Sequence, residues 1–201
     1  MEINCVRPEK LYRYSERKWL ERSLRLGEFR LMPASFYTEL EGDAARQDYE
    51  LCRSRSVAPE LVYISREDGQ LIRPIGEVMF TNRLLRDYLM ICFSSHRYPE
   101  DAGGFSGADA CLVIHDPEEL LERLHAKIEA AVRGGISMDA SVSYGVPHEL
   151  GVAYSKPAAY AAQCEYRLTV LPPDDRLLSP LLISIGSIEA IAEIAPIEAT
   201  R

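Results

Sequence analysis

Two short apolar runs constrain the fold of this chain more than any other feature of its sequence. Tyr88 to Ser94 (YLMICFS) and Ala108 to Ile114 (ADACLVI) have the length of β-strands and show little polar alternation. A strand that carries apolar side chains on both faces needs both faces covered. Each run therefore predicts a buried strand.

The clearest helix is predicted directly after the second run. Asp116 is a suitable N-cap, Pro117 occupies a position where its missing N–H does no harm, and the following Glu118 and Glu119 suit the positive end of the helix dipole. An apolar face then repeats at helical spacing as far as the glycine pair 134–135. A second helix is predicted between a Ser15 cap and a stop at Gly27.

The other elements are shorter. Strands are predicted at 28–32, 61–64, 71 onward, 141–146, 165–171 and 181–185, with a tight turn at Asp68-Gly69, and helices at 43–53 and 188–194. These elements mix without a regular β-α-β alternation, and the chain shows no internal repeat or break in composition. The sequence therefore predicts one α+β domain over residues 1–201, with a mainly antiparallel sheet flanked by a few helices.

Composition and cysteine usage limit the class of protein. The chain has 201 residues, 47% of them apolar, and a net charge of −8, which is ordinary for a soluble globular protein. No apolar run approaches the ~18 to 20 residues that cross a bilayer, and the N-terminus lacks the apolar segment of a secretory signal. The five cysteines are widely separated and unpaired in spacing. We therefore expect reduced thiols, a cytoplasmic protein and no membrane partner.

The charges are unevenly distributed. Residues 1–30 hold eight Lys and Arg against five Glu, so the rest of the chain is strongly acidic. The acidic balance argues against bulk nucleic-acid binding, which depends on neutralising phosphates. The basic N-terminal segment is either a solvated face with Glu–Arg pairs or a local site for a phosphorylated small molecule.

Several catalytic motifs are missing from the sequence. It contains no G-x-x-x-x-G-K-[ST], no G-x-G-x-x-G after a strand, no H-E-x-x-H and no G-x-S-x-G. Nucleoside triphosphatases, Rossmann dehydrogenases, zincins and α/β-hydrolases are thus disfavoured. No two histidines have the spacing of metal ligands, so we expect no metal site.

The stretch from Ser155 to Leu168 is the richest in chemistry. On a strand, Gln163, Glu165 and Arg167 share one face, whereas Cys164, Tyr166 and Leu168 share the other. The second set has the character of core. The first is either a solvent-facing strand face with a Glu165–Arg167 pair or a catalytic carboxylate positioned by its neighbours.

Two further segments are candidates for ligand binding. Arg13 stands between Tyr12 and Tyr14, and its planar guanidinium suits phosphate or carboxylate. Arg30 lies on the predicted strand 28–32 and could face the same side. The second segment is Ser94-Ser95-His96, at the end of a buried strand, where functional loops often begin. Each has a structural alternative: a surface ion pair for Arg13, hydroxyls that satisfy loop backbone for the serines, and an ordinary loop histidine.

The order of these residues resembles that of the arginine–serine–glutamate mono-ADP-ribosyltransferases. Arg13 on an early strand, Ser94-Ser95 after a middle strand and Gln163-x-Glu165 on a late strand carry the resemblance. It implies that NAD is the substrate, that Arg13 holds its phosphates and that Ser94 supports the site. It also implies that Gln163 orients the acceptor and that Glu165 is catalytic.

A larger part of the chain resembles a group of uncharacterised bacterial proteins. The segments L-Y-R-Y, C-F-S, A-D-A-C-L-V-I-H-D-P and S-K-P followed by E-Y-R-L carry this second resemblance. Some relatives of that group are associated with phage defence. The resemblance implies a shared fold without a known activity.

Three functions remain open from the sequence. The first is an enzyme acting on a dinucleotide, which requires Arg13, Ser94 and Glu165 to meet in one cleft. The second is a non-catalytic binding or regulatory protein with an unknown protein partner. The third is a metal-dependent nuclease or phosphodiesterase that uses Asp48, Glu50 or Asp109 with Glu165 and Lys156, which the acidic net charge disfavours.

Overall fold

The apolar run that ends at Ser94 forms the central strand of the sheet. In the computed structural model, which describes residues 6–38, 51–97, 107–174 and 178–197, this strand is β7 (Leu89–Ser94). One edge of β7 pairs with β12 (Glu165–Leu171), which pairs in turn with β9 (Ile136–Ser141). These pairings are antiparallel, as predicted, and the chain has the predicted α+β architecture.

The other edge of β7 is shared by two strands. Its start pairs with β2 (Glu28–Pro33) and its end with β1 (Leu11–Ser15). Beyond β2 lies β13 (Leu181–Ser184). Beyond β1 lie β8 (Ala110–Ile114) and then β14 (Ala192–Pro196). The sheet thus divides into two branches at β7. Ser94, the last residue of β7, pairs with β1 at the start of one of these branches.

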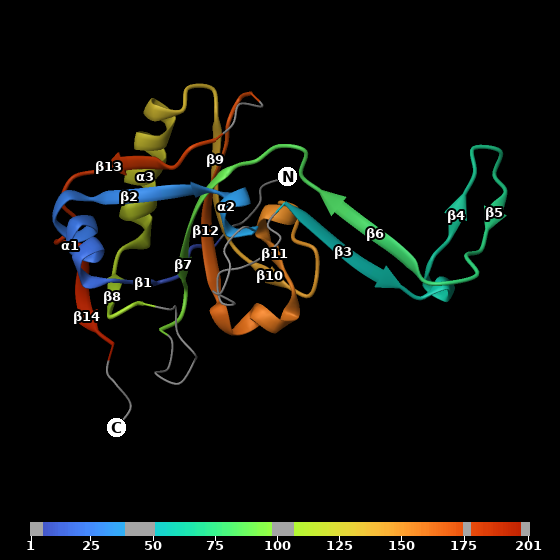
Figure 1. Ribbon diagram of the computed structural model, residues 1–201, viewed down its shortest axis with the longest axis horizontal. Coiled ribbons are helices and arrows are strands. Elements are labelled where there is room, and N and C mark those ends of the chain that lie inside the picture. Colours follow the sequence, from blue (N-terminus) through green and yellow to red (C-terminus); the bar gives the residue numbers. More distant parts are fainter. Residues whose placement is uncertain (1–5, 39–50, 98–106, 175–177, 198–201) are drawn as a thin grey trace.

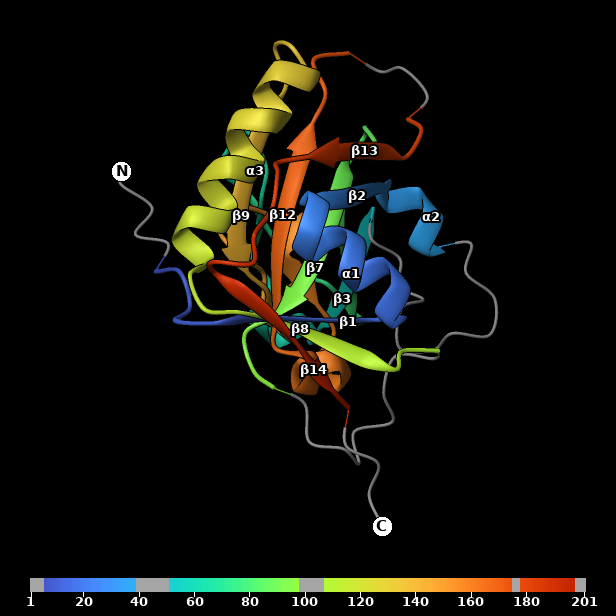
Figure 2. The ribbon, with the colours of Figure 1, turned by 90° about the vertical axis from the view of Figure 1, so that its left-hand side faces the viewer.

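Two helices cover one face of the sheet, as Figure 2 shows. They are α1 (Arg17–Leu26) and α3 (Pro117–Ala131), and their buried leucines pack on Ile91, Phe93 and Leu168 in the main core. The predicted start of α3 is confirmed, because the Asp116 carboxylate accepts the N–H of Glu119 at 3.0 Å. The helix-covered face of these strands belongs to this core, so the opposite face remains for a functional site formed by the strands.

The start of α1 differs from the prediction. Ser15 belongs to β1, and Glu16 occupies the N-cap position without a cap hydrogen bond to its own side chain. The Asp109 carboxylate accepts the N–H of Arg17, the first residue of the helix. The predicted stop is correct: Gly27 has a φ of +62°, and a Cβ there would meet the carbonyl oxygen of Gly186 at 2.0 Å. Both the backbone conformation and the close approach therefore require glycine at this position.

A smaller layer of short elements belongs to the second half of the chain. It consists of β10 (Ser143–Tyr144), η2 (Val152–Tyr154), β11 (Ser155–Lys156) and η3 (Ala158–Gln163). Strands β10 and β11 form a two-stranded parallel sheet. A further short helix, α2 (Ala34–Thr38), follows β2 directly.

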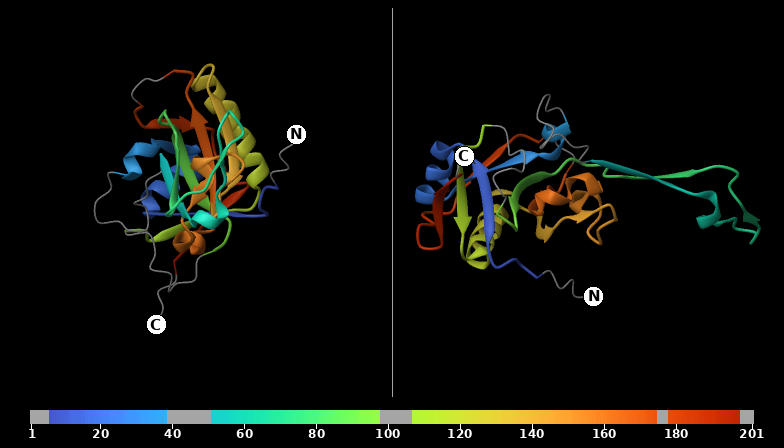
Figure 3. Two further views of the ribbon diagram at one scale, coloured as in Figure 1. Left: turned by 90° about the vertical axis from the view of Figure 1, so that its right-hand side faces the viewer. Right: turned by 90° about the horizontal axis from the view of Figure 1, so that it is seen from below.

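A long hairpin projects from this body, as Figures 1 and 3 show. Its stem is β3 (Cys52–Val57) paired with β6 (Val78–Arg83). Its far part holds η1 (Pro59–Leu61), β4 (Ile64–Ser65) and β5 (Leu71–Ile72). We call residues 52–83 the β-arm.

The β-arm tests two sequence predictions. The turn at Asp68-Gly69 is confirmed, since it joins β4 to β5 and Gly69 has a φ of +82°. The helix predicted over 43–53 is wrong at its end, because Cys52 and Arg53 lie in β3; residues 43–50 lie outside the described part. These two residues pair with β6, and this pairing decides their conformation.

The helix predicted over 188–194 is also wrong. Residues from Ala192 onward form β14, in which Ile194 pairs with Leu112 of β8. A short apolar segment fits either period, and here the free edge of β8 selects the strand. Within the described ranges, no helix is long and apolar enough to cross a membrane.

Candidate functional site

Three predicted site residues stand side by side across neighbouring strands. Ser94 of β7 is the register partner of Glu165 in β12 on one edge and of Tyr12 in β1 on the other. Directly opposed residues of antiparallel strands project to the same face. Tyr12, Ser94 and Glu165 therefore form one row on the face opposite α1 and α3.

The serine turn is bound to the segment that precedes Glu165. Ser94 Oγ lies 2.7 Å from the carbonyl oxygen of His96 and 3.1 Å from that of Gln163. Ser95 donates both its N–H, at 2.8 Å, and its hydroxyl, at 3.0 Å, to the carbonyl oxygen of Cys164. The predicted residues of the two motifs thus meet, although they lie far apart in the sequence.

Glu165 is held by two cations. Lys156 Nζ donates to Glu165 Oε1 at 3.1 Å and to Gln163 Oε1 at 2.7 Å. Arg167 Nε donates to Glu165 Oε2 at 2.8 Å, while its Nη1 donates to the carbonyl oxygen of Ala153 at 2.7 Å. Both carboxylate oxygens therefore have cationic partners.

This cluster is almost fully buried. Lys156 is 4% exposed, Glu165 8% and Arg167 0%. The solvent-facing position considered for Glu165 and Arg167 is therefore wrong, but the Glu165–Arg167 pair of that alternative is present. Gln163 is half-buried and lies in η3 rather than on the strand. Arg167 points away from the helix-covered core, because it pairs with Cys92 while its neighbour Tyr166 packs in that core.

The charges around Glu165 keep it ionised. Burial alone would raise the pKa of its carboxyl, but Arg167 and Lys156 together hold that pKa below its usual value. Tyr144 adds a polar contact: its hydroxyl oxygen accepts the backbone N–H of Glu165 at 2.7 Å, and burial raises the pKa of this tyrosine.

A cavity of about 430 Å³ lies beside the cluster, and Lys156 forms part of its wall. The stem of the β-arm supplies Arg53, Arg55 and Phe80, and the 145–157 region supplies most of the rest. Arg53 joins the two sides, since its Nε donates to the carbonyl oxygen of Ser155 at 2.9 Å. Lys156 thus contacts both the cavity and Glu165.

Arg13 does not join this site, contrary to the sequence prediction. It follows Tyr12 on β1 and so projects to the helix-covered face, where its guanidinium lies 5.9 Å from the ring centroid of Phe93. Its Nη1 donates to the carbonyl oxygen of Cys92 at 3.2 Å. The strand pairing places Tyr12, rather than Arg13, opposite Ser94.

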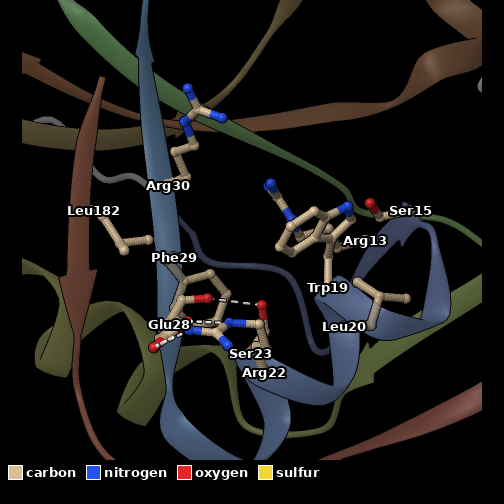
Figure 4. A pocket seen from close by; sticks show the side chains of 10 residues that line it. All are labelled: Arg13, Ser15, Trp19, Leu20, Arg22, Ser23, Glu28, Phe29, Arg30 and Leu182. Carbon is tan, nitrogen blue, oxygen red and sulfur yellow. Dashed lines mark hydrogen bonds and ion pairs between the residues drawn. The ribbon is translucent and has the colours of Figure 1, made fainter. Parts of the chain in front are cut away.

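Arg13 and Arg30 instead line a second cavity, of about 440 Å³, between α1 and β2. Figure 4 shows the indole of Trp19 beside Arg13 and the side chain of Arg30 directed away from them. Arg22 also lines this cavity and is paired with Glu28 at 2.6 Å, as expected for a Glu–Arg pair on a solvated face.

The sequence predicts no contact between Lys156 and Glu165 beyond the nuclease hypothesis, although Lys156 lies in the 155–168 stretch and in the S-K-P segment. It does not single out Tyr144. The sequence signal for Lys156 is the Lys156-Pro157 pair that precedes η3. Because η3 leads directly into β12, Lys156 lies close to the start of that strand. For the nuclease hypothesis, Asp48 and Glu50 lie outside the described residues, and Asp109 accepts the N–H of Arg17 at 2.5 Å.

Among the residues that the structure describes, no group of three or more His, Cys, Asp or Glu side chains could hold a metal ion. The described cysteines form no disulfide: Cys111 is buried, which raises the pKa of its thiol, whereas Cys92 is only half-buried.

No protein-family model, curated protein or solved structure matches the chain.

Proposed function

We propose that the chain is an enzyme that acts on NAD, transferring or releasing its ADP-ribose unit, with Glu165 as the catalytic carboxylate. The observation that carries the proposal is the contact between the Ser94–His96 turn and the Gln163–Glu165 segment. The pairing of β7 with β12 makes this contact, and the serine hydroxyls bind backbone carbonyls on both sides of it. The resemblance to arginine–serine–glutamate transferases requires this contact and also Arg13, which lies on the other face of the sheet, so the proposal keeps the serine and the glutamate and replaces the arginine.

The charge state of Glu165 suits the reaction. When the bond between ribose C1′ and the nicotinamide nitrogen breaks, nicotinamide leaves as a neutral molecule with the bonding electron pair. Positive charge then develops on the ribose, and an ionised carboxylate nearby stabilises it. An acceptor hydroxyl, amine or water bonds to C1′ and releases a proton. A carboxyl whose pKa is held low is ionised at neutral pH and ready for this role.

The cavity beside Lys156 provides the binding site in this proposal. Its volume of about 430 Å³ is in the range of small-molecule sites. Arg53, Arg55 and Lys156 offer cations for the diphosphate, and Phe80 offers an aromatic face. These residues would replace Arg13 as the phosphate-binding group. Lys156 would give up its hydrogen bond to Glu165 Oε1 and bind the diphosphate instead. That carboxylate oxygen would then face the ribose.

The test is nicotinamide release from labelled NAD by the purified protein. We expect release by the wild type and a loss of at least about 100-fold in Glu165→Gln, the order of effect of removing one electrostatic stabiliser. Because this change removes the carboxylate that both buried cations contact, the double variant Lys156→Met/Glu165→Gln removes one cation as well and keeps the net charge of the wild type for a folded comparison. Glu193→Gln, an exposed substitution on β14, is the matched control.

The outcomes separate clearly. Release that survives in the folded double variant contradicts a catalytic role for Glu165. Absence of release by the wild type, together with no thermal stabilisation by NAD, overturns the dinucleotide proposal as a whole.

A second candidate is a non-catalytic binding or regulatory protein of the bacterial group linked to phage defence. One observation favours it: both oxygens of Glu165 already have cationic partners, as in a structural ion-pair cluster. This candidate predicts that NAD or another anion binds near Lys156 without cleavage. Calorimetric titration with NAD, followed by analysis of the recovered ligand, distinguishes intact binding from turnover.

A further inference from the structure

The β-arm exposes more apolar surface than an isolated hairpin in water normally carries. Nine large apolar side chains on it or just beyond it are exposed: Leu61, Tyr63, Ile64, Leu71, Ile72, Ile75, Met79, Phe80 and Leu85. In the described part of the chain, β3 and β6 pair only with each other. A two-stranded ribbon is marginally stable, and a sheet of three or more strands is the usual remedy.

The outer edge of β6 is the accessible one. The base of β3 contacts the body through Arg53 and Ser155, whereas β6 lies on the side of the β-arm away from β10 and β11, as Figure 1 shows. Proteins normally protect an open edge with lysine, proline or a bulge. The sequence of β6, VMFTNR, has no lysine or proline and a single charge. Such an edge is suited to pairing with another strand.

The sequence around β6 is complementary to itself in one antiparallel register. A two-fold axis at Phe80 places Met79 opposite Thr81 of a second copy. It also places Glu77 opposite Arg83 of that copy, and the reverse pair forms by symmetry. Ile75 and Leu85, both almost fully exposed, approach each other at the two ends. The register thus matches opposite charges and apolar groups without placing like charges together.

We propose that β6 pairs with β6 of a second copy of this chain about a two-fold axis at Phe80, forming a four-stranded sheet from two β-arms. An isologous interface of this kind is the commonest form of oligomer. At ~3.3 Å per residue, the far part of each β-arm extends past the base of the other. The exposed apolar residues around β4 and β5 then lie beside the body of the second copy instead of in water.

Charge reversal tests this register. We expect the wild type to be dimeric in light scattering after size exclusion. We expect Glu77→Arg, which places Arg opposite Arg83, to raise the dimer dissociation constant about 10-fold. Arg83→Glu has the same effect. The double variant Glu77→Arg/Arg83→Glu restores the wild-type constant, because the pairs are exchanged. Glu129→Arg on α3 makes the same charge change away from the β-arm and leaves the constant unchanged.

A cross-link tests the position of the axis. Phe80→Cys brings two thiols opposite each other at a Cα separation that a disulfide spans, so oxidation yields a covalent dimer. Ser54→Cys on β3 is the control, since the two copies of β3 lie three strand spacings apart and cannot be linked. A monomeric wild type, or equal cross-linking of the two cysteine variants, overturns the proposal. Failure of the double charge variant to recover also overturns this register.

Discussion

At the scale of single residues, Glu165 and Arg167 form a polar row on β12, on the opposite face of the strand from Tyr166. Both faces are buried, so the polar row needs partners from other elements, and Lys156 and Ala153 supply them. Those partners depend on how η2, β11 and η3 pack, which no local pattern encodes.

Removing Arg167 tests the energetic role of this cluster. Arg167→Met leaves the carbonyl oxygen of Ala153 without this donor and removes one cation from Glu165. Breaking a buried ion pair from one side costs about 3–5 kcal/mol, which we expect as the loss in free energy of unfolding by urea denaturation. Arg133→Met, at an exposed position, is the control and changes that free energy by less than about 0.5 kcal/mol. Equal effects would contradict the assignment.

A second buried carboxylate links β9 to α3. Asp139 accepts hydrogen bonds from Arg7 at 3.0 Å and from Tyr166, and it contacts His125 at 2.6 Å. Burial alone would raise the pKa of Asp139, but hydrogen bonds from His125, Arg7 and Tyr166 hold it well below its usual range. The ionised Asp139 carboxylate therefore contributes its full stabilisation of the fold above about pH 4, the pKa of an aspartate in the unfolded chain. This contribution is lost as the pH falls towards the lower pKa of Asp139 in the folded protein.

This sign gives a prediction for Asp139→Asn. At pH 7 the variant unfolds more easily by about 2–3 kcal/mol, because hydrogen bonds to a charged group are lost. The difference in free energy of unfolding between wild type and variant narrows as the pH is lowered from 5 to 3, because the wild type then loses the stabilisation by ionised Asp139 that the variant lacks at every pH. Urea unfolding of both proteins at a series of pH values measures this difference. A difference that widens on acidification would contradict the pKa direction.

At the scale of elements, local signals predicted the buried strands and the capped helix. β7, β8, β12 and α3 follow from apolar runs, alternation and the Asp116 cap, all of which are properties of short segments. The stem of the β-arm was missed because its strands are mostly exposed and lack an apolar face that alternates. The sequence predicts a helix where β14 forms, because the pairing of β14 with β8 depends on residues far away in sequence.

The cap of α3 provides a direct test at this scale. Asp116→Ala removes the acceptor for the N–H of Glu119 and lowers the free energy of unfolding by about 1 kcal/mol. Asp116→Ser keeps an acceptor and loses less. Glu122→Ala, within the same helix and exposed, shows the effect of a surface change without the cap. If the two alanine variants lose the same stability, the cap is not responsible.

At the scale of the whole molecule, the α+β class was predictable but the site was only partly so. The order of Ser94 and Gln163-x-Glu165 in the sequence anticipated a contact that the sheet makes. The register of β1 decides that Tyr12 faces this site and Arg13 faces the other, and a shift of one residue would reverse them. Pairing register is a property of the assembled sheet, so the sequence could not exclude Arg13.

The structure also separates two cavities that the sequence merged into one site. One lies beside Lys156 at the base of the β-arm, and the other lies between α1 and β2 with Arg13 and Arg30. The proposed function assigns the dinucleotide to the first. A ligand in the second would be separated from Glu165 by the sheet, because Glu165 projects to the opposite face.

The most direct test of the proposed function is therefore a crystal structure of the protein with a non-hydrolysable NAD analogue. The proposal predicts that the diphosphate lies in the cavity formed with Arg53 and Arg55, Lys156 turns towards it, and the nicotinamide ribose contacts the Glu165 carboxylate. An analogue that occupies the Arg13–Arg30 cavity, or that does not bind at all, would contradict it.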